Sequence, residues 1–141
     1  MTAKQYLRQL SKLELNIRIL TDELEERRTR LTSTAAPALG DKVQSSPRGD
    51  AFAAAMATLV DKDLKRTEMI YVYEQMRDRI VEQILGLDNV TQSQVLYERY
   101  VRRQSLRMIA DEMVYSYDRI CHIHGEALVA FSKRYLDDSR Q

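Results

Sequence analysis

Residues 105–128 read SLRMIADEMVYSYDRICHIHGEAL, and their pattern predicts two helices separated by a tight turn. Ser105 and Ser116 each precede a run of apolar residues with helical spacing, the place where a hydroxyl N-cap is preferred. We therefore predict helices over 105–113 and 116–136 that cross as a helix-turn-helix. This unit commonly places its second helix in the major groove of DNA.

The composition favours an all-α protein. The chain has 141 residues, of which 44% are hydrophobic and 30% are charged, with four Gly, two Pro and no Trp. Strand patterns are nearly absent. No apolar run reaches the roughly 18 residues that a membrane span needs, and the first residues lack the apolar core of a signal peptide. The single cysteine excludes an intrachain disulfide framework and fits a reducing compartment. We expect a cytoplasmic protein that does not associate with membranes.

Two long helices are predicted before the helix-turn-helix. In residues 3–31, eight positions recur in alternating steps of four and three, which indicates a heptad pattern. They are Tyr6, Leu10, Leu13, Ile17, Leu20, Leu24, Arg27 and Leu31. Residues 51–87 predict a second helix, with Asp50 as its N-cap. Its hydrophobic residues form two stripes out of register with each other, so we expect the packing face to shift, or to change partners, near residues 63–67. The stripes are Phe52, Met56, Leu59, Val60 and Leu64, then Met69, Tyr73, Met76, Ile80 and Leu87.

The stretch between the two long helices, residues 32–50, is small and polar and contains Pro and Gly, which predicts a flexible linker. Val43 is a candidate apolar anchor within it. A linker of this length allows the second helix to fold back antiparallel on the first, or to pair with another chain. We expect residues 1–90 to form a long helical hairpin that oligomerises, and residues 91–141 to form a DNA-binding domain.

Turn and capping residues predict the start of this second domain. Gly86 and the Asp88-Asn89 pair are expected to end the second long helix. Thr91 with Gln94 three residues later fits a capping box, so a further helix is predicted over 91–102. With the two helices after it, the domain has the three helices that a helix-turn-helix unit needs for a small core of its own.

The C-terminal third resembles region 4 of bacterial sigma factors. The residues that carry the resemblance are Ser105-Leu106, Ile109-Ala110, Ser116, Arg119-Ile120, Ile123 and Ala127-Leu128. Over nearly its full length the chain resembles small phage and prophage transcriptional regulators of Gram-positive bacteria, related in style to the RinA and ArpU activators. Tyr6-Leu7, the linker string DKVQSSP at 41–47 and His124 carry this wider resemblance. It implies an all-α fold, a long coiled-coil-like hairpin followed by a three-helix sigma region 4-like domain.

The chain also departs from the sigma pattern. Val114 stands where a turn Gly is common, and a β-branched residue disfavours positive φ. Tyr117 and Cys121 stand where Arg is frequent, His122 replaces a Gln, and Glu126 replaces a basic residue. The scaffold is kept while the promoter-contacting side chains are not. Recognition of the usual −35 sequence is therefore not expected.

Site residues follow from the exposed side of the second helix. The candidate base-reading residues are Tyr117, Asp118, Cys121 and His122. The candidate phosphate contacts are Arg102, Arg103, Ser105, Arg107 and Arg119. Because the net charge is only +1, DNA binding has to come from such local arginines. The plainer alternative for each arginine is a solvated charge or an intrahelical pair, such as Arg107 with Asp111.

Metal and catalytic chemistry are not expected. Cys121 and His124 share a helix face, but a closed zinc site needs four ligands and no complete set is present. We expect His124 to pack or hydrogen-bond inside the small domain. There is no phosphate-binding glycine loop, no metalloprotease motif and no spacing that supports a catalytic triad. The protein is therefore predicted to be no enzyme and to need no cofactor.

The sequence and the resemblance together predict a sequence-specific regulator of phage or prophage transcription, an activator of late genes. Its expected partners are double-stranded DNA and a second copy of the chain, as a homodimer or higher homo-oligomer, since two half-sites compensate for the modest affinity of one recognition helix. Two alternatives stay open. One is a sigma-like module that binds the host RNA polymerase, and the other is a DNA-packaging subunit like a small terminase.

Overall fold

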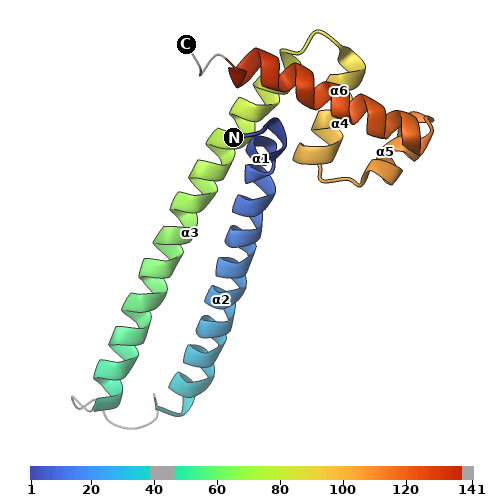
Figure 1. Ribbon diagram of the computed structural model, residues 1–141. Helices are drawn as coiled ribbons and strands as arrows, with labels where there is room; N and C mark the ends of the chain where they lie inside the picture. The colour runs from blue at the N-terminus through green and yellow to red at the C-terminus, as the bar shows by residue number, and fades with distance from the viewer. Residues whose placement is uncertain (39–46, 138–141) are drawn as a thin grey trace. The chain divides into compact units, whose positions relative to one another are not determined.

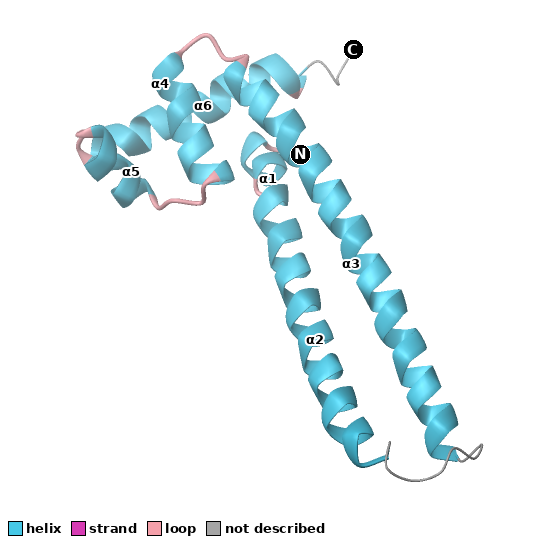
Figure 2. Ribbon diagram, turned by 180° about the vertical axis from the view of Figure 1, so that it is seen from behind, coloured by secondary structure: helices cyan, strands magenta, loops and turns pink. Residues whose placement is uncertain are grey.

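The computed structural model describes residues 1–38 and 47–137 and is all-α (Figure 1). Its elements are α1 (Ala3–Leu7), α2 (Gln9–Ala38), α3 (Pro47–Leu85), α4 (Val90–Leu96), the π-helical turn η1 (Tyr97–Val101), α5 (Leu106–Met113) and α6 (Tyr117–Tyr135). No strand occurs within the described residues (Figure 2). The predicted fold class is confirmed. The predicted helices form with other bounds: the first is divided at Arg8 into α1 and α2, and the one predicted over 91–102 is α4 continued by η1.

The chain divides into two compact units, one of which combines both ends of the chain. The first, here called the composite unit, comprises Met1–Leu13 and Tyr73–Gln141. The second, the hairpin unit, comprises Glu14–Val72. The boundary predicted at residue 90 is therefore not where the chain divides. The ends of both long helices belong to the composite unit, because their apolar residues lie in its core.

In the hairpin unit, the heptad pattern of α2 is confirmed, and α2 and α3 run side by side (Figures 1 and 2). None of the heptad positions within this unit is exposed, and Leu24 is buried. On α3, five of the six residues of this unit that are not exposed also alternate in steps of four and three. They are Ala55, Leu59, Lys62, Arg66 and Met69, and the sixth is Asp63, which pairs with Arg66 at 3.0 Å. Both helices thus contribute one continuous heptad seam, and cationic side chains occupy part of it.

The stripe predicted at the start of α3 is wrong as a packing face. Of its five residues only Leu59 is buried, whereas Phe52, Met56, Val60 and Leu64 are exposed. Four of these residues follow one another in steps of four, and each such step turns about 40° beyond a full helical turn. A stripe of this kind winds around the helix and cannot follow a straight partner. The packing face of α3 therefore does not shift near residues 63–67. The predicted stripe winds away from this face and becomes exposed.

The linker prediction needs correction at both of its ends. Residues 32–38 continue α2 and residues 47–50 begin α3. Extending an existing helix adds one hydrogen bond per residue, and Thr32 Oγ1 also donates to the carbonyl of Arg28 at 2.6 Å. Pro47 occupies the first helical position, where its missing N–H leaves no bond unmade. Asp50 consequently lies in the first turn of α3 and is not its N-cap. Residues 39–46, with the predicted anchor Val43, lie outside the described residues.

The larger core of the composite unit joins the beginning of the chain to the C-terminal helix. Leu7 and Leu10 are buried there together with Ile84 of α3 and Phe131 of α6. The hydroxyl of Tyr6 donates to Gln83 Oε1 at 2.9 Å, which links the first turns of the chain to the end of α3. This core explains why the N-terminal residues belong to the same unit as the helix-turn-helix.

Gly86 follows the last residue of α3, and space requires a glycine at this position. None of the described glycines has a positive φ, so the residue that follows α3 is not in the left-handed conformation. A Cβ at Gly86 would collide with the hydroxyl of Tyr135, which approaches the backbone at this point. The next helix begins earlier than predicted, because Asn89 Oδ1 accepts from the backbone N–H of Gln92 at 3.0 Å. Asn89, and not Thr91, is the N-cap.

Candidate nucleic-acid interface

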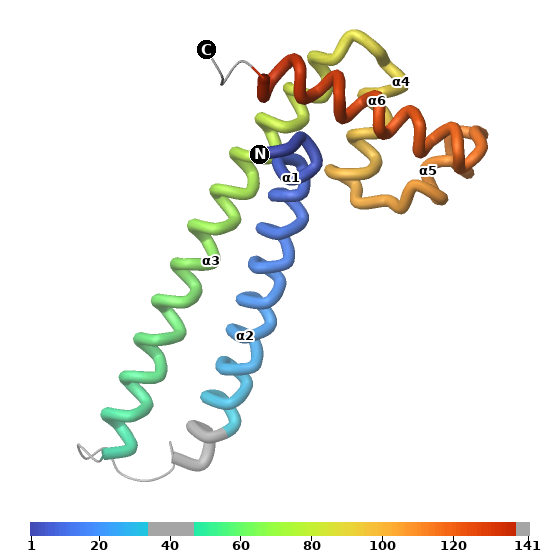
Figure 3. The backbone as a smooth tube through the Cα atoms, in the orientation of Figure 1, coloured from blue at the N-terminus to red at the C-terminus, as the bar shows by residue number. Residues whose placement is uncertain are grey.

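The helix–turn–helix of α5 and α6 forms as the two serines predicted. The Ser105 hydroxyl accepts from the backbone N–H of Met108 at 3.2 Å, and the Ser116 hydroxyl accepts from that of Arg119 at 3.2 Å. A second, smaller core lies beneath them. It consists of Val95, Ile109, Ala110 and Ile120. The chain path from α4 through η1 and α5 into α6 can be followed in Figure 3.

The turn between the helices contains an unusual backbone conformation. Val114 adopts the left-handed region, with φ 58° and ψ 44°, and its N–H bonds to the carbonyls of Ala110 and Asp111. It caps α5 as a glycine would, although a β-branched residue is strained there. Its side chain is 89% exposed, so no packing contact offsets the strain. The sequence predicts that valine disfavours a positive φ at this position. The turn adopts it nevertheless, and its N–H bonds stabilise this conformation.

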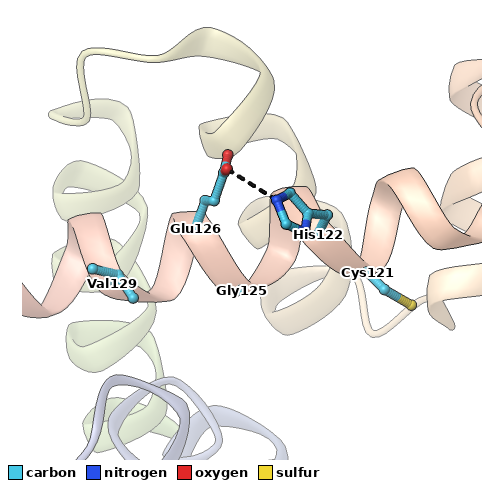
Figure 4. Close-up of a pocket in the computed structure, with 5 residues that line it drawn as sticks. All are labelled: Cys121, His122, Gly125, Glu126 and Val129. Carbon is cyan, nitrogen blue, oxygen red and sulfur yellow. Dashed lines mark ion pairs between the residues drawn. The ribbon is translucent and has the colours of Figure 1, made fainter.

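The predicted base-reading residues all lie on the outward side of α6. Tyr117, Asp118 and His122 are exposed, and Cys121 is half-buried. Figure 4 shows His122 directed towards Glu126, with Glu126 Oε1 3.4 Å from His122 Nε2, while the Cys121 side chain points away from this pair. Together with Gly125 and Val129 these residues line a shallow depression of about 430 Å³. A glycine in this part of a helix carries no side chain that would keep another molecule away.

Two arginine–tyrosine pairs flank the start of α6. The Arg107 guanidinium of α5 lies over the ring of Tyr117, 4.8 Å from its centroid. Arg119 lies over the ring of Tyr115 at 5.2 Å. Such cation–π contacts stabilise by roughly 0.5–1 kcal/mol at exposed sites. They hold two cations beside the first turn of α6. A side-chain hydrogen bond with Cys121 raises the pKa of the Tyr117 phenol, so the ring stays neutral and able to donate.

The predicted phosphate contacts have different local partners. Arg102 is paired with Glu98, with Nε–Oε2 at 3.8 Å, and remains largely exposed. Arg103 has a positive φ of 58°, in the turn that precedes α5. The Ser105 hydroxyl accepts in the cap, so its O–H remains available to donate to a phosphate oxygen. Arg107 lies over the ring of Tyr117, across the turn.

His124 belongs to the core side of α6, as predicted. Its Nε2 lies 2.8 Å from the hydroxyl of Tyr100, and the two rings stack. Burial lowers the pKa of His124 and raises that of Tyr100, because it disfavours the charged form of each group. The cations that lower the pKa of His124 further are Arg99, Lys4 and Arg8. Both groups are therefore neutral near pH 7.

Sequence reasoning missed Tyr115 and the partner of Arg107. Tyr115 precedes the N-cap Ser116 and lies outside α6, so helical spacing does not link it to Arg119 in the sequence. Arg107 and Tyr117 lie on different helices, and only the turn geometry brings them together. The alternative prediction, an ion pair of Arg107 with Asp111, is based on spacing within one helix.

Other kinds of site find little support in the described residues. No group of three or more His, Cys, Asp or Glu side chains in them could hold a metal ion. Within the same residues, no helix combines the length and apolar character required to cross a membrane. Searches of protein-family models, curated proteins and solved structures find nothing that matches this chain.

Proposed function

We propose that the α5–turn–α6 unit binds double-stranded DNA, with the first turns of α6 in the major groove. The observation that carries the proposal is the pair of arginine–tyrosine contacts, Arg107 with Tyr117 and Arg119 with Tyr115. They bring two cations and two hydroxyls close to an exposed helix N-terminus that rests on the small core of the unit. Positive charge beside the N-terminal end of an exposed helix suits a phosphate backbone on either side of a groove.

The exposed side chains of α6 divide into two roles in this proposal. Tyr117 and His122 hydrogen-bond to base edges, Asp118 accepts from a cytosine amine, and the small Cys121 permits close approach. Arg102, Arg103, Arg107 and Arg119 contact phosphates and set affinity without sequence preference. Ser105 joins that set as a neutral donor, because its hydroxyl accepts in the cap and can still donate its proton to a phosphate oxygen.

The biological role proposed is regulation of transcription in a phage or prophage programme, as an activator of late genes in the cytoplasm of the bacterial host. The support is the resemblance described above, together with an all-α chain that pairs a helix–turn–helix with a long hairpin. A dimer would present two such units to two half-sites, which compensates for the modest affinity of one helix.

One observation favours a second candidate, contact with the host RNA polymerase. Val114 and Met108 are exposed by 89% and 53%, and both lie on α5 or at its end. Exposed apolar side chains beside a DNA-binding helix suit a protein partner better than a phosphate backbone. In this alternative the unit binds polymerase directly and contacts DNA weakly or not at all.

The test separates the two roles of the side chains. A binding site is selected from random duplexes, and wild type, Arg103→Ala and His122→Ala are titrated at two salt concentrations. Arg103→Ala should weaken all duplexes alike and lower the salt slope by about one. His122→Ala should lose roughly 1–3 kcal/mol of discrimination at one base pair. Polymerase retained on the immobilised protein after nuclease treatment, with equal affinity for all duplexes, would favour the second candidate.

A further inference from the structure

The hairpin unit exposes more large apolar side chains than it buries. Of its described residues, nine of this kind are exposed and two, Leu24 and Leu59, are buried. The exposed ones are Leu15, Ile19, Phe52, Met56, Val60, Leu64, Ile70, Tyr71 and Val72. Helices in proteins derive most of their stability from packing an apolar face. Many apolar side chains of this unit therefore have no packing partner within the part of the chain that the structure describes.

The exposed residues of α3 form a second heptad pattern. Beginning at Ala53, exposed positions follow in steps of four, three, four, three and four. They are Ala53, Ala57, Val60, Leu64, Thr67 and Tyr71, here called the outer face. At about 100° per residue the outer face lies roughly 160° around the helix from the inward seam. A helix with two heptad seams on opposite sides is the pattern of a helix that packs between two partners.

The charge near the outer face argues against nucleic acid as the occupant. Asp61 and Glu68 border the outer face on one side, and Asp63 lies on the other. Asp63 is already bonded to Arg66 at 3.0 Å. Carboxylates beside an apolar strip repel a phosphate backbone. The occupant has to be a protein surface with apolar side chains of matching spacing.

The outer face is complementary to itself when two copies run antiparallel. With residue 62 as the midpoint, Val60 faces the Leu64 of the second copy, Ala57 faces Thr67 and Ala53 faces Tyr71. Each small side chain then meets a larger one, which is how helices fill space without voids. A parallel pairing would set Tyr71 against Tyr71 and Ala53 against Ala53, and would leave the small end loosely packed.

We propose that the outer face of α3 binds a second copy of this chain, with the two α3 helices antiparallel. The large side chains of the outer face, Val60, Leu64 and Tyr71, are 53%, 59% and 64% exposed within the chain. A second copy seated on the outer face would remove this apolar surface from water, which is the main driving force of association. The proposal deepens the DNA-binding function by naming the surface that joins two recognition helices.

The first test is the oligomeric state in sedimentation equilibrium without DNA, so its outcome is independent of the proposed function. Wild type should be a dimer, and Leu64→Glu should raise the dissociation constant at least 100-fold. Leu64 is 59% exposed within the chain, so helicity by circular dichroism should be unchanged. The control is Lys65→Glu, an exposed neighbour outside the outer face, which should stay dimeric. A monomeric wild type, a ring of eight or more copies, or a dimeric Leu64→Glu protein would overturn the proposal.

The second test determines the direction of the helices by disulfide cross-linking. In a Cys121→Ser background, which removes the native thiol, one protein carries Ala57→Cys and another carries Thr67→Cys. The antiparallel pair predicts cross-linked dimers when the two proteins are mixed and oxidised, and little when Ala57→Cys is oxidised alone. Within one chain the two positions are about 15 Å apart along the helix, too far for a disulfide. Efficient cross-linking of Ala57→Cys with itself would contradict the antiparallel arrangement.

Discussion

Replacing Val114 by glycine should stabilise the protein, although it removes an apolar side chain. The left-handed backbone at Val114, with φ 58° and ψ 44°, costs a non-glycine residue roughly 1–3 kcal/mol. Glycine adopts this conformation freely. It also increases the conformational entropy of the unfolded chain, which destabilises the folded protein by about 0.4–1 kcal/mol. The side chain is 89% exposed, so its removal forfeits almost no burial. The expected net gain for Val114→Gly is about 1 kcal/mol.

The assay is thermal and urea unfolding followed by circular dichroism. For a chain of this size, a gain of about 1 kcal/mol raises Tm by roughly 3–4 °C. Val114→Ala is the matched control, because it shortens the side chain and keeps the steric cost of positive φ, so it should change Tm far less than glycine does. An unchanged or lower Tm for Val114→Gly would show that the valine is not strained, and would refute the argument from the turn geometry.

Three further predictions concern the interface, the core and the hairpin. Gly125→Ala should stabilise α6 by roughly 0.5–1 kcal/mol, because nothing lies within 4 Å of an added Cβ. Its affinity for DNA should fall if α6 approaches the duplex at this residue. A variant less stable than wild type in urea unfolding would contradict the predicted stabilisation. The lowered pKa of His124 means that the unfolded chain takes up its proton first, so stability should fall as the pH drops below about 6.5 and level off below the folded pKa. His124→Gln should flatten that part of the pH profile, and an unchanged profile would assign the effect elsewhere. Leu24→Asp should cost several kcal/mol, since it buries a carboxylate in the heptad seam, whereas the exposed Leu15→Asp should cost little in the monomer; equal effects in thermal unfolding would refute the assigned seam.

Local signals in the sequence predicted the elements well. Ser105 and Ser116 cap their helices as expected, because an N-cap depends on a hydroxyl and the next three residues. The heptad pattern of α2 also held, since alternating steps of four and three keep side chains on one face.

Longer-range features were beyond such signals. The stripe from Phe52 to Leu64 is apolar and helical in spacing, yet the fold packs Lys62 and Arg66 towards α2 and leaves the stripe exposed. One helix can carry apolar residues on more than one face. Which face becomes buried depends on the position of the partner helix, which a single helix's sequence does not contain. The burial of Leu7 against residues more than 70 positions away in the chain had no sequence signal either.

The same limit applies to the candidate interface. Which side of α6 faces outward followed from its periodicity, so the positions of Tyr117 and His122 could be predicted. The stacking of Arg107 on Tyr117 could not, because it depends on the angle that the turn at Val114 imposes between two helices.

The selection of duplexes from a random pool tests the central claim most directly. Purified full-length protein is mixed with random duplexes, bound DNA is recovered and sequenced over successive rounds, and affinity for the enriched site is compared with affinity for the starting pool. A recognition helix with specific base contacts predicts one enriched motif, bound at least about 1,000-fold more tightly than random DNA at physiological salt. A pool that remains random after repeated rounds, with no preference in titration, would contradict the assignment of α6 as a base-reading helix.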